Sequence, residues 1–142
     1  MTKMIKYTLL AILLLVLAFL AMLLLFVSSG NSNTIYFDIE QQAVVRCKGT
    51  ISNLYIISKD NEDYFLILSE KKESNIFMIK ELDKNYSIKT MTTPIGLQNF
   101  KLRPETEYEI INHSNGGAVD GKLLIKTDKN SSVIYADKTS CK

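Results

Sequence analysis

The fold of this chain is decided by residues 102–112, which read Leu-Arg-Pro-Glu-Thr-Glu-Tyr-Glu-Ile-Ile-Asn. From Glu107 to Ile110 polar and apolar side chains alternate, which is the period of a half-buried β-strand. Pro104 fixes its own backbone torsion and therefore suits a corner placed just before such a strand. We expect Leu102 and Tyr108 to pack into a core from either side of this corner.

The same stretch resembles the tyrosine-corner region of fibronectin type III domains, in which a Leu-x-Pro-x-x-x-Tyr pattern opens the sixth strand. The resemblance implies an immunoglobulin-like β-sandwich with residues 107–112 as its sixth strand, 114–120 as the following loop and 121–127 as its seventh strand. The alternative is a plain β-hairpin that happens to contain this Leu-x-Pro pattern.

Short runs rich in Ile, Val, Tyr and Phe continue on both sides of the corner, separated by turn-forming clusters such as 59–63 and 115–117. Such runs suit a pleated, half-buried surface, and no window carries a helical stripe of apolar residues. The sequence therefore predicts an all-β domain over residues 35–142, an antiparallel sandwich or barrel of eight or nine strands. The resemblance at 102–112 implies that it is an immunoglobulin- or fibronectin type III-like sandwich. The expected strands are 35–40, 43–48, 54–58, 64–69, 75–80, 86–91, 107–113, 122–127 and 132–136.

A different pattern precedes this domain. Residues 9–27 are 19 consecutive apolar residues, ten of them Leu. A helix of that length spans roughly 28 Å, close to the ~30 Å hydrocarbon core of a bilayer. We therefore expect one transmembrane signal anchor over residues 8–27, which is in contact with membrane lipid, after a cytoplasmic tail at 1–7 and before a linker at 28–34.

Flanking charge sets the expected orientation of the anchor. Lys3 and Lys6 precede the apolar run, and no basic residue follows it until Arg46. The positive-inside rule places the N-terminus in the cytoplasm, so the chain is a single-pass protein of the inner (plasma) membrane with a periplasmic or extracellular domain. The alternative is a signal peptide cleaved after Ser29 or Gly30.

The formal net charge of +2 says little about partners. Without residues 1–30, which hold Lys3 and Lys6, the remainder has as many acidic as basic residues. A neutral domain of this size is not a basic nucleic-acid binder, and its length rules out a multidomain enzyme.

The two cysteines, Cys47 and Cys141, both belong to the external domain. An oxidising compartment permits a disulfide between them. A loop of about 95 residues would then be closed, which stabilises by up to about 4.7 kcal/mol in a chain-entropy estimate. The alternative is two unpaired thiols. Their spacing relative to the single histidine, His113, matches no zinc site.

No catalytic pattern stands out in the sequence. His113 reads as a turn residue at a strand end, and no nucleophile elbow or phosphate-binding glycine loop accompanies it. Asp60, Glu62 and Asp63 crowd one turn and could bind Ca²⁺ weakly, but they read more simply as a solvated hairpin tip. We therefore expect no enzyme activity, no cofactor and no metal site.

One acidic pattern could serve recognition. Glu105, Glu107 and Glu109 alternate along a strand and would share a face with Arg103 and Ile111. Such a stripe could meet a basic surface on a partner. The alternative is the wet outer face of an antiparallel sheet.

These features favour a protein-binding module over an enzyme. The overall plan of a short basic tail, one anchor and a small β-rich domain is similar to that of membrane-anchored periplasmic immunity proteins of bacterial interference systems. This resemblance implies that the chain binds and neutralises a toxin delivered into the periplasm. The alternative is an accessory subunit of an envelope complex for secretion or division, and a small hydrolase is a more distant third.

Overall fold

The structure is a computed structural model that describes residues 12–22, 34–70, 74–91, 93–113 and 119–141. The chain divides into two compact units, Met1–Ser32 and Asn33–Lys142. In the first unit residues 12–22 form a helix. Among the described residues no helix has the length and apolar character needed to cross a membrane. The rest of the predicted anchor and the cytoplasmic tail lie outside the described residues, as does the linker up to residue 33.

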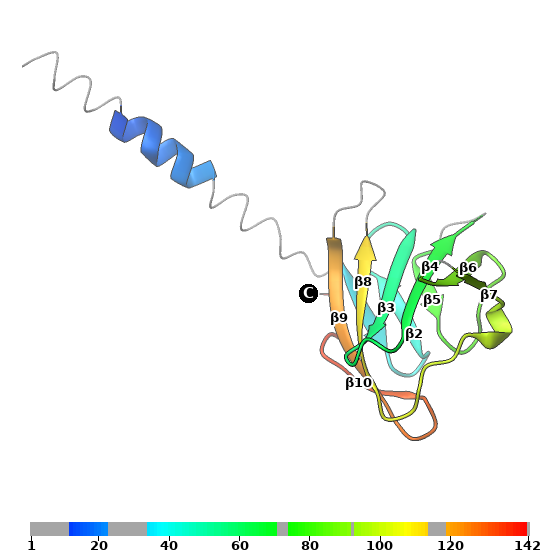
Figure 1. Ribbon diagram of the computed structural model, residues 1–142. Helices are drawn as coiled ribbons and strands as arrows, with labels where there is room; N and C mark the ends of the chain where they lie inside the picture. The colour runs from blue at the N-terminus through cyan, green and yellow to red at the C-terminus, as the bar shows by residue number, and fades with distance from the viewer. Residues whose placement is uncertain (1–11, 23–33, 71–73, 92, 114–118, 142) are drawn as a thin grey trace, which may run out of the picture. The chain divides into compact units, whose positions relative to one another are not determined.

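The second unit is a sandwich of two antiparallel sheets (Figure 1), so the predicted sandwich architecture is confirmed. The smaller sheet has the order β1-β2-β5, with β1 at Ile35–Asp38, β2 at Ala43–Arg46 and β5 at Ile76–Met78. The larger sheet has the order β10-β9-β8-β3-β4-β6-β7. Its strands are β3 (Asn53–Ser58), β4 (Tyr64–Ser69), β6 (Tyr86–Thr90), β7 (Thr93–Ile95), β8 (Glu107–His113), β9 (Val119–Thr127) and β10 (Val133–Ala136).

The described residues hold ten strands instead of the expected eight or nine. The unpredicted strand is β7, which is followed by a single 3₁₀ turn, η1, at Leu97–Asn99. Its three residues include Pro94, which cannot donate to a sheet ladder and is confined to edges. Strand β9 also starts earlier than expected, at Val119. Gly121 in β9 permits β1 to approach, because a Cβ there would lie 2.5 Å from Thr34 Oγ1.

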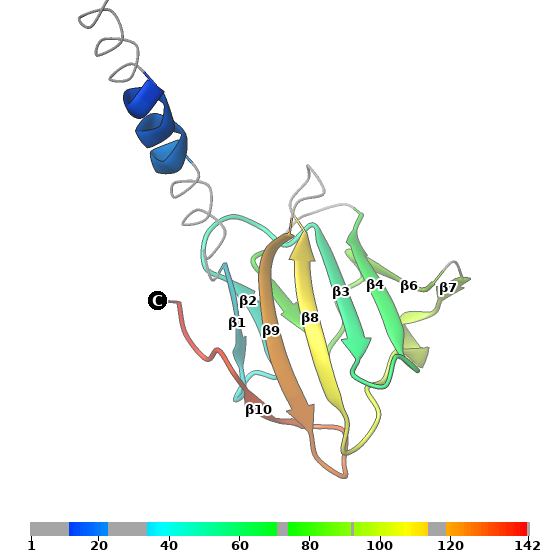
Figure 2. The same ribbon diagram turned by 60° about the vertical axis from the view of Figure 1, so that its left-hand side comes forward.

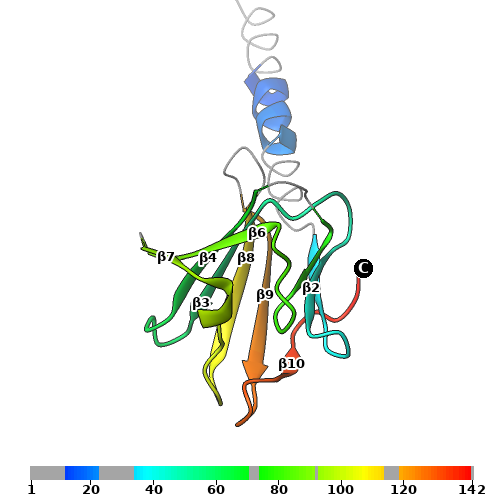
Figure 3. The same cartoon turned by 90° about the vertical axis from the view of Figure 1, so that its right-hand side faces the viewer.

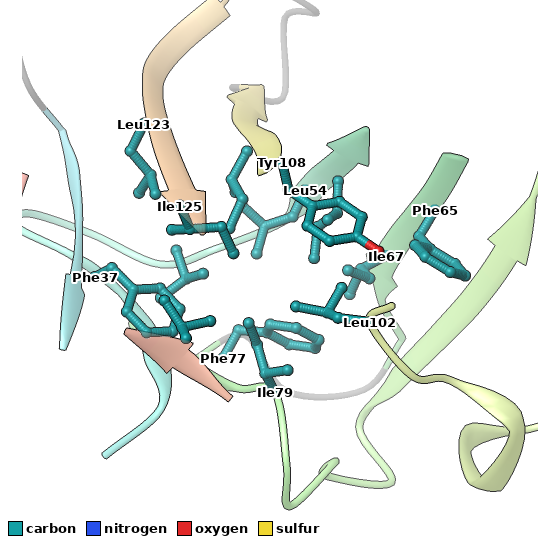
Figure 4. Close-up of a cluster of buried hydrophobic side chains, with 14 of the residues drawn as sticks. Phe37, Leu54, Phe65, Ile67, Phe77, Ile79, Leu102, Tyr108, Leu123 and Ile125 are labelled. Carbon is teal, nitrogen blue, oxygen red and sulfur yellow. The ribbon is translucent and has the colours of Figure 1, made fainter. Parts of the chain in front are cut away.

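The core lies between the two sheets, and side chains from both sheets point into it (Figure 4). Strands β3 and β8 alternate buried with half-buried residues along their whole length, as expected for one face on a core. Leu102 is 2% exposed and Tyr108 is fully buried. Every buried member of this core lies between Ile35 and Ala136. Residues 33–142 thus carry their own hydrophobic core, which is what independent folding requires.

The C-terminal segment closes the sandwich along β1 and β9 (Figure 3). The backbone N–H of Phe37 donates to the carbonyl of Lys138 at 2.9 Å, and that of Asp137 donates to Leu124 at 3.0 Å. Cys47 and Cys141 form a disulfide with a Cα–Cα distance of 5.7 Å, which confirms that prediction. The bridge therefore ties the end of the chain to the residue that follows β2.

Candidate functional site

The outward side of the larger sheet carries an unusual number of apolar side chains. Strands β9, β8, β3 and β4 lie side by side and present this side together (Figure 2). In β3 and β4 the residues between the core positions are Tyr, Ile and Leu, and they are half-buried. We call this surface the apolar outer face and define it by Tyr55, Ile57, Tyr64, Leu66, Leu68, Ile111 and His113.

Strand register brings these side chains together. Tyr55 in β3 lies opposite Leu66 in β4 and Ile111 in β8. Ile57 lies opposite Tyr64. Opposite residues in antiparallel strands have neighbouring side chains on the same face. The apolar outer face is therefore one continuous patch across three strands.

Aromatic contacts order the middle of this patch. The rings of Tyr55 and Tyr64 meet edge to face with centroids 6.0 Å apart, and the ring of Tyr55 lies 4.7 Å from that of His113. Burial raises the pKa of the Tyr64 hydroxyl above its ordinary value. The histidine that was predicted in a turn is thus the last residue of β8, and its ring packs on that of Tyr55.

The predicted acidic stripe has a different arrangement in the structure. Glu107 and Glu109 lie on the outward side of β8, but Glu105 precedes the strand, in the corner, with a backbone φ of 51°. Glu107 accepts a hydrogen bond from Lys59 at 2.8 Å, and Glu109 from Lys122 at 3.1 Å. The hydrogen bond from Lys59 holds the pKa of Glu107 below its ordinary value. Both glutamates on the strand are therefore ion-paired.

The corner itself is built from backbone and side-chain hydrogen bonds. The N–H of Arg103 donates to the hydroxyl oxygen of Tyr108 at 2.7 Å, and that hydroxyl donates to Asp63 Oδ2 at 2.6 Å. Burial, and then the hydrogen bond to Asp63, raise the pKa of Tyr108 to about 12. Pro104 is exposed at the turn, while Leu102 points into the core beside Tyr108 (Figure 4).

The acidic hairpin between β3 and β4 is occupied by Arg103. Its guanidinium binds Asp60, Glu62 and Asp63, each with an N–O distance of 2.7 Å. The hydrogen bond from Arg103 lowers the pKa of Asp60. A cation site was one interpretation of this turn, but among the residues that the structure describes no group of His, Cys, Asp or Glu could hold a metal ion. Sequence reasoning missed this contact because the partners are 40 or more residues apart.

Another polar cluster, which is half-buried, lies near the disulfide. Arg46 pairs with Asp120, which also accepts a hydrogen bond from the amide of Asn112 at 3.5 Å. The hydroxyl of Thr34 donates to the carbonyl of Asp120. Arg46 Nε and Asn112 Oδ1 are buried without a hydrogen-bond partner among the described residues. This cluster links the beginning of β1 to β2, β8 and β9, and no pattern in the sequence predicted it.

Hollows occur at the edge of the apolar outer face. One of about 390 Å³ is lined by Lys59, Asp60, Glu105, Thr106, Glu107 and Lys126. Another of about 330 Å³ lies beside Tyr64 and Met91. The larger sheet thus carries a broad patch of half-buried aromatic and aliphatic side chains with ion pairs at its rim.

Comparison of the chain with protein-family models, with curated proteins and with solved structures found no match.

Proposed function

We propose that residues 33–142 form a protein-binding module whose binding surface is the apolar outer face. The observation that carries the proposal is the row of Tyr, Ile and Leu side chains on the outward side of β3, β4 and β8. Strands that are apolar on both sides are typical of sheets covered on both sides. A contiguous apolar patch on a small domain is typical of an interaction site.

The module is proposed to work outside the cytoplasm, at the inner membrane. Two features support this location. The disulfide between Cys47 and Cys141 suits an oxidising compartment. The apolar run at 9–27 follows Lys3 and Lys6, which favours a cytoplasmic N-terminus and an external domain.

Within the sandwich class we propose an immunoglobulin- or fibronectin type III-like domain. The hydrogen bond from the Arg103 N–H to the Tyr108 hydroxyl supports this assignment, because it ties the strand to backbone just upstream. The order β9-β8-β3-β4, facing β1-β2-β5, is compatible with it. Strands β6, β7 and β10 extend the larger sheet beyond that common set.

The partner is proposed to be a toxin delivered into the periplasm, which makes the chain an immunity protein. A tethered module with a preformed binding face would hold such a toxin where membrane- or wall-directed damage occurs. Binding that occludes the toxin's functional surface suffices for neutralisation, and this chain then needs no catalytic residues of its own.

The test combines capture with a phenotype. The oxidised chain carrying Tyr55→Ser is compared with wild type in affinity capture from cells attacked by siblings. Tyr36→Ser is the matched control, because Tyr36 is also a half-buried strand tyrosine but belongs to the smaller sheet. We expect Tyr55→Ser to lose one captured partner and to sensitise cells, and Tyr36→Ser to leave both properties unchanged.

Two outcomes would contradict this proposal. Equal capture by wild type and Tyr55→Ser would remove the apolar outer face as the binding surface. Capture of stable envelope machinery, together with unchanged resistance of a deletion strain, would exclude immunity and favour an accessory subunit of an envelope complex.

A further inference from the structure

Strand β10 presents two consecutive apolar side chains to solvent. The pairing register between β10 and β9 shifts between Val133 and Tyr135, which is a β-bulge. A bulge breaks the alternation of a strand and re-aims a side chain. As a result Val133 and Ala136 keep their core positions, while Ile134 is 57% exposed and Tyr135 is 55% exposed.

The neighbouring strand adds an exposed leucine between two lysines. Leu124 on β9 is 48% exposed, and Lys122 and Lys126 flank it on the same side of the strand. Tyr135 lies opposite Lys126 in the register. Together with Glu107 and Ile125, the three residues Leu124, Lys126 and Tyr135 line a hollow of about 130 Å³. Drug-sized ligands occupy roughly 300–1,000 Å³, so this hollow suits a single side chain.

The acidic side chains near this hollow, Glu107 and Asp137, already have partners within the structure. Glu107 is held by Lys59 at 2.8 Å, whereas its distance to Lys126 is 3.8 Å. The carboxylate of Asp137 accepts the backbone N–H of Leu124 at 2.8 Å. The side chain of Lys126 remains half exposed, and an ammonium group has three donors to offer.

The hollow lies on the same side of the larger sheet as the apolar outer face, and the ion pair between Lys122 and Glu109 stands between the two. Leu124 lies opposite Glu109 in β8, and Lys122 lies opposite Ile111. Leu124 is therefore the diagonal neighbour of Ile111 on the outward side of the sheet. A partner that covers the apolar outer face would reach this hollow without crossing a sheet edge.

We infer that this hollow is an anchor subsite of the binding surface, and that it receives an apolar side chain next to a carboxylate on a protein partner. The inference rests on the proposed function and deepens it, because it names the chemistry of the partner. Leu124 and Tyr135 offer apolar contact, and Lys126 is placed to pair with a neighbouring carboxylate, whereas Lys122 is already paired with Glu109 at 3.1 Å. Buried apolar anchors in pockets carry most of the energy of such contacts, and the surrounding charges select the partner.

The test uses two small probes of opposite charge on oxidised residues 33–142. Indole-3-acetate joins an aromatic ring to a carboxylate, and tryptamine joins the same ring to an ammonium group. Methyl and aromatic NMR signals of Leu124, Ile125 and Tyr135 report where each probe binds. We expect indole-3-acetate to shift these signals with a Kd on the order of 1 mM, as its size allows.

Charge selection is the decisive part of the test. We expect tryptamine to bind about fivefold more weakly, a factor that an exposed charge pair can supply. Lys126→Gln should remove this preference, whereas Lys89→Gln, on β6 beyond the apolar outer face, should keep it. Equal binding of both probes, shifts confined to other residues, or no shift at 10 mM would overturn the inference. So would probe-free, concentration-dependent shifts of the same signals, because these would show a second copy of the chain in the hollow.

Failure of this inference is distinguishable from failure of the proposed function. If neither probe selects the hollow while partner capture still depends on Tyr55, the anchor assignment alone is wrong. If capture does not depend on Tyr55, the binding surface itself is wrong.

Discussion

The two sides of the larger sheet are built from similar residues but meet different surroundings. On the inner side Leu54, Ile56 and Ile67 are completely buried against the smaller sheet. On the outer side Tyr55, Ile57 and Leu66 have the same apolar character but are only half-buried. Strands β3 and β4 therefore read as continuous apolar runs and not as alternating ones.

We propose that the inner side of the larger sheet stabilises the fold and that the outer side binds a partner. An antiparallel sheet that faces water on one side usually carries polar residues there. The inner side has its covering layer, so its side chains hold the fold together. The outer side has a tyrosine-centred patch with ion pairs at its rim, and we propose that a partner protein covers it. Substitutions on the inner side should thus lower the free energy of unfolding, and substitutions on the outer side should mainly weaken partner binding.

The largest contrast comes from two adjacent isoleucines. Ile56→Ala removes a fully buried side chain and should lower the free energy of unfolding by about 2–5 kcal/mol. Ile57→Ala, on the apolar outer face, should cost less than about 1.5 kcal/mol because the side chain keeps solvent contact when folded. Denaturant titration of both variants makes the comparison. Equal losses would contradict the division between the two sides.

Loss of the disulfide should come next in size. Replacing both Cys47 and Cys141 by Ser removes the covalent link between the C-terminal segment and the residue that follows β2. The segment is then held by its hydrogen bonds to β1 and β9. We expect a loss of about 2–4 kcal/mol, in the usual range for a native bridge. Thermal unfolding of oxidised wild type and of the double variant measures it. A melting temperature that does not change would mean that the hydrogen bonds from Phe37 and Asp137 hold the segment unaided.

The corner gives a smaller effect on the inner side. Tyr108→Phe keeps the buried ring but leaves the Arg103 N–H and the Asp63 carboxylate without their shared partner. We expect a loss of about 1–3 kcal/mol, the usual cost of an unpaired buried polar group. Unchanged denaturant midpoints for wild type and Tyr108→Phe would show that water replaces the hydroxyl at no cost.

The raised pKa of the Tyr108 hydroxyl predicts how the stability of the fold decreases at alkaline pH. Its pKa is raised to about 12 in the folded chain, against an ordinary value near 10. The unfolded state therefore releases its proton first, so the stability contribution is complete below pH 10 and is lost between about pH 10 and 12. The slope of unfolding free energy against pH in this window should be shallower in Tyr108→Phe. Identical slopes would assign the alkaline loss to other groups.

The rim of the apolar outer face should show the smallest stability effect. Glu107→Gln removes ion pairs with Lys59 and Lys126, both of them largely in solvent. Exposed pairs add little to stability. We expect no measurable change in the denaturant midpoint, but a changed salt dependence of partner binding. A clear fall in stability would place Glu107 among the structural residues.

Much of the inner side was predictable from sequence. Alternation of polar and apolar residues identified β8, and short runs rich in Ile, Val, Tyr and Phe identified β1, β3 and β4. The Leu102-x-Pro104 pattern placed the corner, and the two cysteines suggested their bridge. These signals are local, or depend on only two residues of one type.

What escaped sequence reasoning depends on distant partners. Nothing near Arg103 in the sequence indicates that its guanidinium will sit in the hairpin at 59–63. The three glutamates suggested an open acidic stripe, but lysines from other strands and turns neutralise two of them. Strand β7 carries too few apolar residues to stand out. The apolar outer face emerged only when the strand order brought β3, β4 and β8 together.

The most direct test of the account is site-specific photo-crosslinking in living cells. A photoreactive phenylalanine analogue replaces Tyr55 on the apolar outer face in one strain, and Tyr36 on the smaller sheet in another. We expect a discrete covalent adduct between the chain and one other protein at position 55, and none at position 36. An adduct at position 36 alone, or no adduct at position 55 under conditions that protect the cells, would contradict it.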